Sequence, residues 1–251
     1  MFYTNTNRNF IVNADITEWD IHSANISLIK TFKLLSEDKI HKIEDLNKKD
    51  RVIKVGLEMQ KDKNFSKQLE SHFNDVIKEF IESNNLDQDY DITSIKRDAA
   101  FVVNRKITKH QFGKYIDFLP KNHYHAYLYI KPYEFYFGKN NNIDIKGLRD
   151  EIYSLHQNGI LTLLNDIVLI AEESNMNTKK INRYLSDYTK AYKNRELDFD
   201  MYREFTNESK FKYIMMGNEM LLDNIDDELI EKIDISHNYL NIIMPLIQLL
   251  C

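Results

Sequence analysis

The sequence contains little of what would point to a secreted or membrane protein. One cysteine occurs in 251 residues, Cys251 at the last position, which excludes an internal disulfide framework and a zinc site built from several cysteines. The first residues lack the basic and then apolar profile of a signal peptide, and no apolar run is long enough to cross a bilayer. We therefore expect a cytoplasmic protein that does not enter a membrane.

Glycine and proline are also scarce, at six and three residues, and no flexible linker or internal repeat is visible. A hydrophobic content of 43% is enough to build a core, so we expect closely packed parts. The net charge of −5 argues against a protein that grips nucleic acid over its whole surface, although it is compatible with a local basic groove. A stretch rich in lysine and arginine over 179–195 would provide one, and a solvated helix face would explain it equally well.

The spacing of apolar residues predicts an α+β fold in which a mixed first half precedes a mostly helical second half. Extended segments are predicted over 10–21, 92–103 and 124–137, the last two as hairpins, with a tight turn at Lys96-Arg97 in the first hairpin. Helices are predicted over 25–35, 38–46, 51–59, 65–81, 150–173, 178–194, 201–204 and 234–250.

Two aspartates attract attention because each ends a strand-like apolar run and is followed by small or apolar residues. Asp20 follows Ile16-Thr17-Glu18-Trp19, and Asp98 precedes Ala99-Ala100-Phe101. Carboxylates on adjacent strands of one sheet can share divalent metal ions, which is the minimal equipment for transferring a nucleotide to a hydroxyl. Plainer explanations exist for both: Asp20 could cap a helix, and Asp98 could belong to a solvated turn.

The order of these pieces resembles the palm and thumb of family B DNA polymerases, including the protein-primed phage type, over nearly the whole chain. The family's first palm motif, Asp-x-x-Ser-Leu-Tyr-Pro-Ser, is similar to residues 20–27, which keep the aspartate and both serines. Its second motif, Asp-Thr-Asp-Ser, is similar to residues 96–99, which keep the second aspartate. The resemblance implies that Asp20, the carbonyl of Ile21 and Asp98 bind Mg²⁺ or Mn²⁺.

Between these motifs the family carries a fingers helix that holds the incoming triphosphate, with the pattern Lys-x-x-x-Asn-Ser-x-Tyr-Gly. Residues 51–57 resemble its cationic start, and the resemblance implies that Arg51 and Lys54 contact the phosphates. Asn25 stands at the position of the family tyrosine that stacks under the sugar and excludes a 2′-hydroxyl. Asn25 is therefore expected to contact the nucleotide without the same discrimination between sugars.

After the second motif the family has a Lys-x-Tyr segment and a Lys-Gly step, both of which touch nucleic acid. Lys121 and Tyr124 resemble the first with one residue inserted, and Lys146-Gly147 resembles the second. The resemblance implies that these residues position a primer–template by its backbone, where cations and hydroxyls act without reading sequence.

The resemblance also implies a division of the chain. Residues 1–147 would form a palm-like domain with a fingers remnant over about 25–60, and residues 148–251 a helical, thumb-like region. Only 31 positions separate Asp20 from Arg51, and no exonuclease domain fits upstream of Asp20. Such a reduced enzyme would act on primer–template and nucleoside triphosphates, with a second protein chain as a partner that could complete it.

Three functions compete at this stage. The first is a template-dependent nucleotidyltransferase that uses Asp20 and Asp98. The second is a degenerate palm that no longer polymerises and binds nucleic acid or a partner protein; Lys96 in place of the family's first aspartate favours it. The third is a helical interaction protein, for which the apolar segment over 242–247 would serve as a docking helix. Two aspartates on neighbouring strands would argue against the third.

Overall fold

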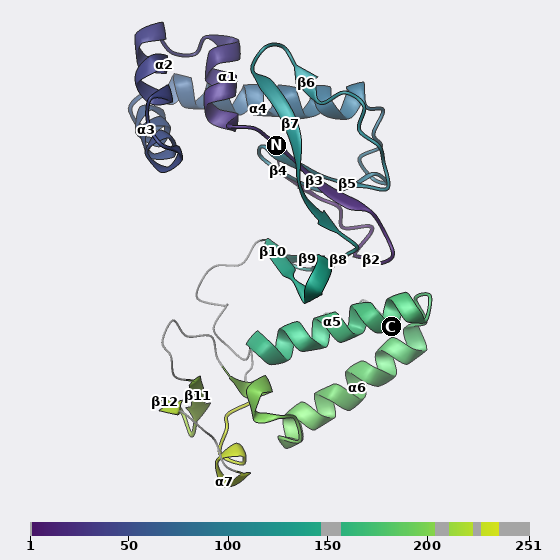
Figure 1. Ribbon diagram of the computed structural model, residues 1–251. Helices are drawn as coiled ribbons and strands as arrows, with labels where there is room; N and C mark the ends of the chain where they lie inside the picture. Colours follow the sequence, from purple (N-terminus) through teal and green to yellow (C-terminus); the bar gives the residue numbers. More distant parts are fainter. Residues whose placement is uncertain (1, 147–156, 204–210, 223–226, 236–251) are drawn as a thin grey trace. The chain divides into compact units, whose positions relative to one another are not determined.

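The structure is a computed structural model that describes residues 2–146, 157–203, 211–222 and 227–235, and it has the predicted α+β fold (Figure 1). The chain divides into two compact units. The first contains Met1–Arg8 and Ala14–Tyr124, and the second contains Asn9–Asn13 and His125–Cys251. The helix predicted over 234–250 lies almost entirely outside the described residues, as does the first part of the helix predicted over 150–173.

An antiparallel sheet with the strand order β1-β4-β5-β3-β7-β6 forms the first unit's framework. Its strands are β1 (Phe2–Thr4), β3 (Ile16–Ile21), β4 (Ile92–Lys96), β5 (Ala99–Val103), β6 (Gln111–Phe112) and β7 (Ile116–Tyr124). Strand β3 lies between the β4–β5 hairpin and the long strand β7. This order places the end of β3 beside the turn of the hairpin, where Asp98 is located.

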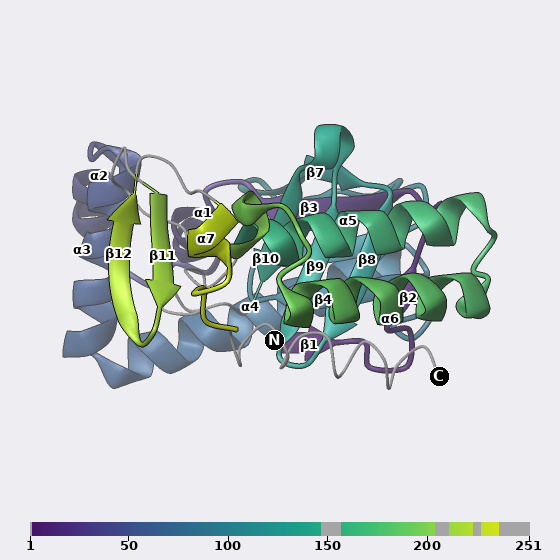
Figure 2. The same ribbon diagram turned by 90° about the horizontal axis from the view of Figure 1, so that it is seen from below.

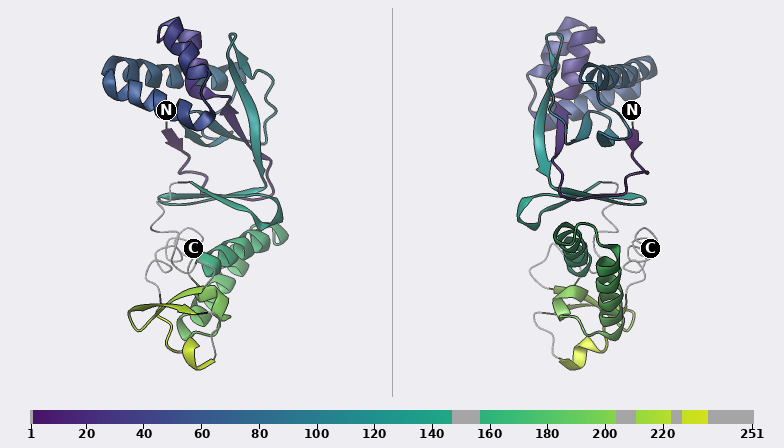
Figure 3. Two further views of the ribbon diagram at one scale, coloured as in Figure 1. Left: turned by 60° about the vertical axis from the view of Figure 1, so that its left-hand side comes forward. Right: turned by 90° about the vertical axis from the view of Figure 1, so that its right-hand side faces the viewer.

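Four helices accompany this sheet: α1 (Ala24–Phe32), α2 (Glu37–Glu44), α3 (Lys48–Lys61) and α4 (Lys63–Ser83) (Figure 3). Helix α4 begins at Asp62, whose carboxylate accepts hydrogen bonds from the amides of Asn64 and Phe65. Its buried residues recur at helical spacing, and they share one apolar core with residues of β4, β5 and β7. Phe80 lies fully buried in this core, with its ring 4.2 Å from that of Phe118 and 6.3 Å from that of Trp19.

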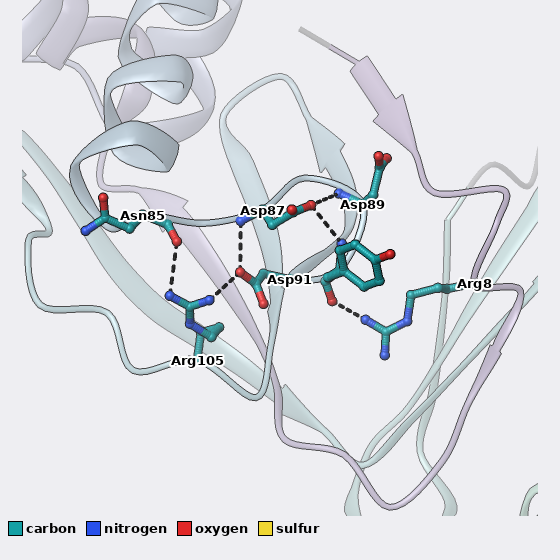
Figure 4. Close-up of polar contacts among 7 residues, drawn as sticks. Arg8, Asn85, Asp87, Asp89, Asp91 and Arg105 are labelled. Carbon is teal, nitrogen blue, oxygen red and sulfur yellow. Dashed lines mark hydrogen bonds and ion pairs between the residues drawn. The ribbon is translucent and has the colours of Figure 1, made fainter.

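The loop between α4 and β4 carries three aspartates, and the carboxylates of two of them bind amides of the same loop (Figure 4). Asp87 accepts hydrogen bonds from the amides of Asp89 and Tyr90, and Asp91 accepts one from the amide of Asp87. Arg105 binds the carboxylate of Asp91 at 2.5 Å. These carboxylates therefore satisfy the backbone of a tight loop that leads the chain into β4.

The second unit combines a smaller sheet with two long helices (Figure 2). The antiparallel sheet has the order β10-β9-β8-β2, from β2 (Phe10–Ile11), β8 (Ala126–Ile130), β9 (Tyr133–Phe137) and β10 (Ile143–Lys146). Apolar residues of β8 and β9 share a core with α5 (Gln157–Glu173) and α6 (Thr178–Asn194). The remaining elements are η1 (Lys139–Asn141), η3 (Phe199–Tyr202), β11 (Phe211–Met215), β12 (Asn218–Leu222) and α7 (Asp227–Ile230).

Most predicted elements match the structure to within a few residues, and α6 matches its predicted range. The turn of the β4–β5 hairpin lies at Arg97-Asp98, one residue later than predicted. The hairpin of β11 and β12 was not predicted, because its turn at Met216-Gly217 lacks the usual Asn-Gly signal. The sheet of β8, β9 and β10 belongs to the second unit. The predicted division of the chain into residues 1–147 and 148–251 rested on resemblance to a family, and it stays a prediction. Among the described residues, no helix is both long and apolar enough to cross a membrane.

The aromatic core of the first unit gives a stability prediction. Replacing Phe80 by alanine should lower the free energy of unfolding by about 3–5 kcal/mol, because the ring is fully buried and its removal leaves a cavity. Trp19 is the only tryptophan of the chain and contacts this core, so urea unfolding followed by its fluorescence measures this unit. Phe2→Ala, at a residue 76% exposed, is the control and should change little. Equal losses for both variants would contradict this description of the core.

Candidate functional site

A pocket of about 670 Å³ opens in the first unit, and its three walls contain residues of β3, α1, α2, α3, β7 and the β4–β5 turn. One wall is the end of β3 with the turn into α1, together with Asp98 from the β4–β5 turn. The second wall comes from α3 and the third from β7. The lining residues are Asp20, Ile21, His22, Ser23, Ala24, Asn25, Ile26, Ile43, Lys48, Arg51, Val52, Val55, Asp98, Leu119, Pro120 and Lys121.

The backbone of the sheet brings the two predicted aspartates together. Asp20 pairs with Ala99 in the register of β3 and β5, and the amide of Ile21 donates a hydrogen bond of 3.0 Å to the carbonyl of Asp98. The turn holds Arg97 at a positive φ of 50°, and its guanidinium lies 4.5 Å from the centre of the Phe73 ring. A residue other than glycine in this conformation is uncommon and occurs often at functional turns. Asp20 lies within β3 and does not cap a helix, since Ser23 is the N-cap residue of α1.

The pocket changes the electrostatics of one of these carboxyl groups. Burial raises the pKa of Asp98 above its ordinary value, and the negative charge of Asp20 raises it further. The hydrogen bond of Asp98 with the backbone and the cations Arg97 and Lys121 act in the opposite direction without cancelling this shift. Asp98 is therefore a partly desolvated acid that faces a like charge, which is a common arrangement at functional sites.

The start of α1 forms part of the same wall. Ser23, at a positive φ of 50°, turns the chain sharply from β3 into the helix, and the hydroxyl of Ser27 holds this turn by donating to the carbonyl of His22 at 2.8 Å. No side chain caps the helix at its N-terminus. The side-chain oxygen of Asn25 is buried and accepts no hydrogen bond from any described residue. The helix N-terminus gives this wall a partial positive charge.

Helix α3 presents one face to the pocket, and the spacing of its residues decides which side chains take part. Lys48, Arg51 and Val55 recur at three or four residues and line the pocket together. Lys54 lies on another face, where it pairs with Glu58 at 3.7 Å, and it does not line the pocket. The structure therefore brings Arg51 to the aspartates but not Lys54.

Strand β7 supplies the third cation of the pocket. The ammonium of Lys121 lies 3.0 Å from the carboxylate of Asp20 and 3.5 Å from that of Glu18, on the neighbouring strand β3. The hydrogen bond to Asp20 is the main cause that raises the pKa of Lys121 above its ordinary value, so the side chain carries its charge here.

Tyr124, another predicted residue, does not line the pocket. Tyr124 is buried, and its hydroxyl donates to Glu18 at 3.2 Å. Lys146 belongs to β10 in the second unit, where it pairs with Asp144 at 2.7 Å, and Gly147 lies outside the described residues. Contacts of these three residues with nucleic acid stay predictions.

The acidic side chains of the pocket can be compared with the ligands that a divalent ion requires. In the described part of the chain, no three or more side chains of His, Cys, Asp or Glu group together in a way that could hold a metal ion. The pocket offers two carboxylates, and Mg²⁺ is commonly held by one or two carboxylates plus the phosphates of a substrate. The mutual repulsion that raises the pKa of Asp98 is also the kind that a bound cation relieves.

Comparison with known families places the chain in a family of phage proteins. The family model described as bacteriophage PBS1 gene 130 protein matches residues 1–251, which is the whole chain. The chain belongs to this family. No curated protein matches the sequence. The description of the PBS1 gene 130 family gives a phage origin and no chemistry, so its function has to be argued from the pocket.

Among the residues not predicted from the sequence are a charged residue that lines the pocket, Lys48, and one beside it, Glu18. Lys48 lies at the start of α3, and only the i, i+3, i+7 spacing with Arg51 and Val55 would have indicated it. Glu18 precedes Asp20 by two residues on one strand, so alternation places both side chains on the same face of the sheet. This alternation is visible in the sequence, but a single glutamate in an apolar run is usually exposed to solvent, so nothing marked Glu18 as part of a site.

The coupling between the two aspartates can be measured directly. In metal-free buffer, Asp20→Asn should lower the pKa of Asp98 toward that of an ordinary aspartate, because the like charge beside it is removed. The pKa is followed by carbon NMR of the labelled carboxyl group during a pH titration. Asp117→Asn is the matched control, since Asp117 lies on the same sheet and pairs with His110 outside the pocket. A pKa of Asp98 that is equal in both variants would show that the aspartates do not interact.

Proposed function

We propose that this chain is a nucleotidyltransferase that extends a nucleic-acid primer along a template, with Asp20 and Asp98 as the ligands of Mg²⁺ or Mn²⁺. The observation that carries the proposal is one pocket lined by two carboxylates that interact electrostatically, together with three cations. This combination suits a metal ion and the triphosphate that accompanies it. The phage origin of the family is compatible with a role in replication.

The chemistry asks the protein mainly for positioning and charge. The primer 3′-hydroxyl attacks the α-phosphorus of the nucleotide; a phosphorus–oxygen bond forms, the bond to the β-phosphate breaks, the hydroxyl proton leaves and pyrophosphate departs. The divalent ion supplies Lewis acidity and neutralises charge on the transferring group when bound. Asp20 from β3 and Asp98 from the β4–β5 turn would hold it, and the carbonyl of Ile21 would be a third oxygen ligand.

The cationic side of the pocket would receive the leaving phosphates. Lys48 and Arg51 line the pocket from one face of α3, and the N-terminus of α1 adds a partial positive charge. Asn25 lies at that N-terminus and would contact the sugar through its amide. Arginine is well suited to phosphate because its guanidinium donates two hydrogen bonds at once.

A degenerate palm that binds nucleic acid or a partner protein is the alternative. It is favoured by one specific observation: Lys96 stands where the resembling family has its first aspartate, so one potential metal ligand is missing. The same pocket would then bind nucleotide or nucleic acid without catalysis. The two proposals share the site and differ in whether a bond is formed.

Primer extension separates these two proposals. The wild-type protein should extend a primed template with dNTPs or rNTPs in Mg²⁺ or Mn²⁺, and Asp20→Ala and Asp98→Ala should each reduce the rate by about a hundred-fold or more, as for loss of a group that stabilises transition-state charge. Asp117→Ala, the matched carboxylate outside the pocket, should remain active. Retained binding of nucleic acid without extension in any nucleotide and metal would favour the degenerate palm.

Arg51 and Lys54, two cations of α3, provide a matched test of where the triphosphate binds. Arg51→Ala should weaken binding of a fluorescent nucleoside triphosphate by roughly ten-fold or more, because hydrogen bonds from a charged group are lost. Lys54→Ala removes the same charge from the same helix, but Lys54 does not line the pocket and should matter little. Equal effects of the two substitutions would argue against this placement of the triphosphate.

A further inference from the structure

The ammonium of Lys121 lies between two carboxylates of β3 that differ strongly in their exposure. It is 3.0 Å from Asp20, whose side chain lines the pocket, and 3.5 Å from Glu18, whose side chain is 4% exposed. Lys121 itself is 54% exposed. A cation therefore already touches one of the two carboxylates assigned to the divalent ion.

A local irregularity of the sheet aims Lys121 at this position. In the register of β3 with β7, Glu18 pairs with Asn122 and Trp19 pairs with Pro120, so that Lys121 is the additional residue of a β-bulge. Bulges redirect a side chain and are frequent beside active sites. Pro120, which has no amide hydrogen to donate, suits such a break in the strand pairing.

Glu18 is fixed by neighbours other than Lys121. Its carboxylate accepts a hydrogen bond of 2.7 Å from the side-chain amide of Asn122 and one of 3.2 Å from the hydroxyl of Tyr124. A buried carboxylate that is held in this way remains in place when the lysine moves. The contact of Lys121 with Asp20 is different, because both side chains reach solvent and exposed ion pairs are weak.

We propose that Lys121 is a built-in counter-cation that occupies Asp20 while no divalent ion is bound and gives up this carboxylate when a metal–nucleotide complex enters. Glu18 keeps the ammonium beside the pocket after it leaves Asp20. The free protein then binds a divalent ion weakly, and nucleotide and metal enter together. Lys121 is thus a positioning residue that controls access to Asp20. The inference rests on the proposed function, since it assumes that Asp20 binds a metal ion.

The test measures binding of Mn²⁺ alone to the full chain, by electron paramagnetic resonance of the free ion, without nucleotide or nucleic acid. Lys121→Met should tighten binding about five-fold or more, because the competing ammonium is removed from Asp20. Lys48→Met removes the same charge from the same pocket, but no ion pair joins Lys48 to either aspartate in the described chain. It should therefore tighten binding clearly less. Circular dichroism verifies that both variants are folded.

The possible results are distinguishable. Tighter binding by Lys121→Met than by Lys48→Met supports the inference. Unchanged affinity in Lys121→Met, or equal gains in both variants, overturns it and leaves the proposed function intact, since wild-type binding is still observed. If neither the wild type nor Lys121→Met binds Mn²⁺ alone, this inference is overturned, and primer extension decides on the proposed function separately. In a chain that already carries Asp20→Asn, which removes the contested ligand, adding Lys121→Met should no longer tighten binding.

Discussion

Two carboxylates that lie together at the ends of neighbouring strands are the constraint on which the rest of the first unit depends. The register of β3 with β5 sets Asp20 opposite Ala99, and the positive φ of Arg97 shapes the turn that carries Asp98. Burial and a like charge both raise the pKa of Asp98. When the pKa of a carboxyl group is higher in the folded state than in the unfolded state, the free energy of unfolding of the protein falls as the pH rises through the folded pKa. Ionisation of Asp98 therefore disfavours folding.

The surrounding elements offset this cost with charge and with packing. Lys121, Lys48 and Arg51 bring three cations to the same pocket from two different elements. Behind the pocket, α4 anchors the sheet through an apolar core in which Phe73, Phe80 and Phe118 are fully or almost fully buried. Phe73 also supports the turn directly, because the guanidinium of Arg97 lies over its ring. The core therefore stabilises the β4–β5 turn, where the charge of Asp98 is unfavourable.

Local patterns were sufficient to predict much of this unit. A strand-end aspartate followed by small residues is visible in the sequence, and for Asp20 and Asp98 the structure brings both residues to one pocket. The features that could not be predicted depend on how helices and strands are oriented in the folded unit. Whether Lys54 or Lys48 reaches the pocket follows from the rotation of α3, which a run of basic residues does not reveal. The position of Lys121 depends on a bulge, and the strand register that creates it is set by pairing with β3.

The choice between the two proposed functions can be argued from the same electrostatics. A site that only binds nucleic acid backbone needs cations, and two facing carboxylates would weaken its binding. The pairing of Asp20 with the partly desolvated Asp98 is thus a disadvantage for a purely binding surface and would be useful for holding a divalent ion. In the absence of metal, Lys121 pairs with Asp20 and neutralises its charge, which weakens the repulsion between the two carboxylates. Lys96 removes one ligand of the resembling family, but the two remaining carboxylates match what Mg²⁺ needs when it arrives with a triphosphate. The physical balance therefore favours the nucleotidyltransferase.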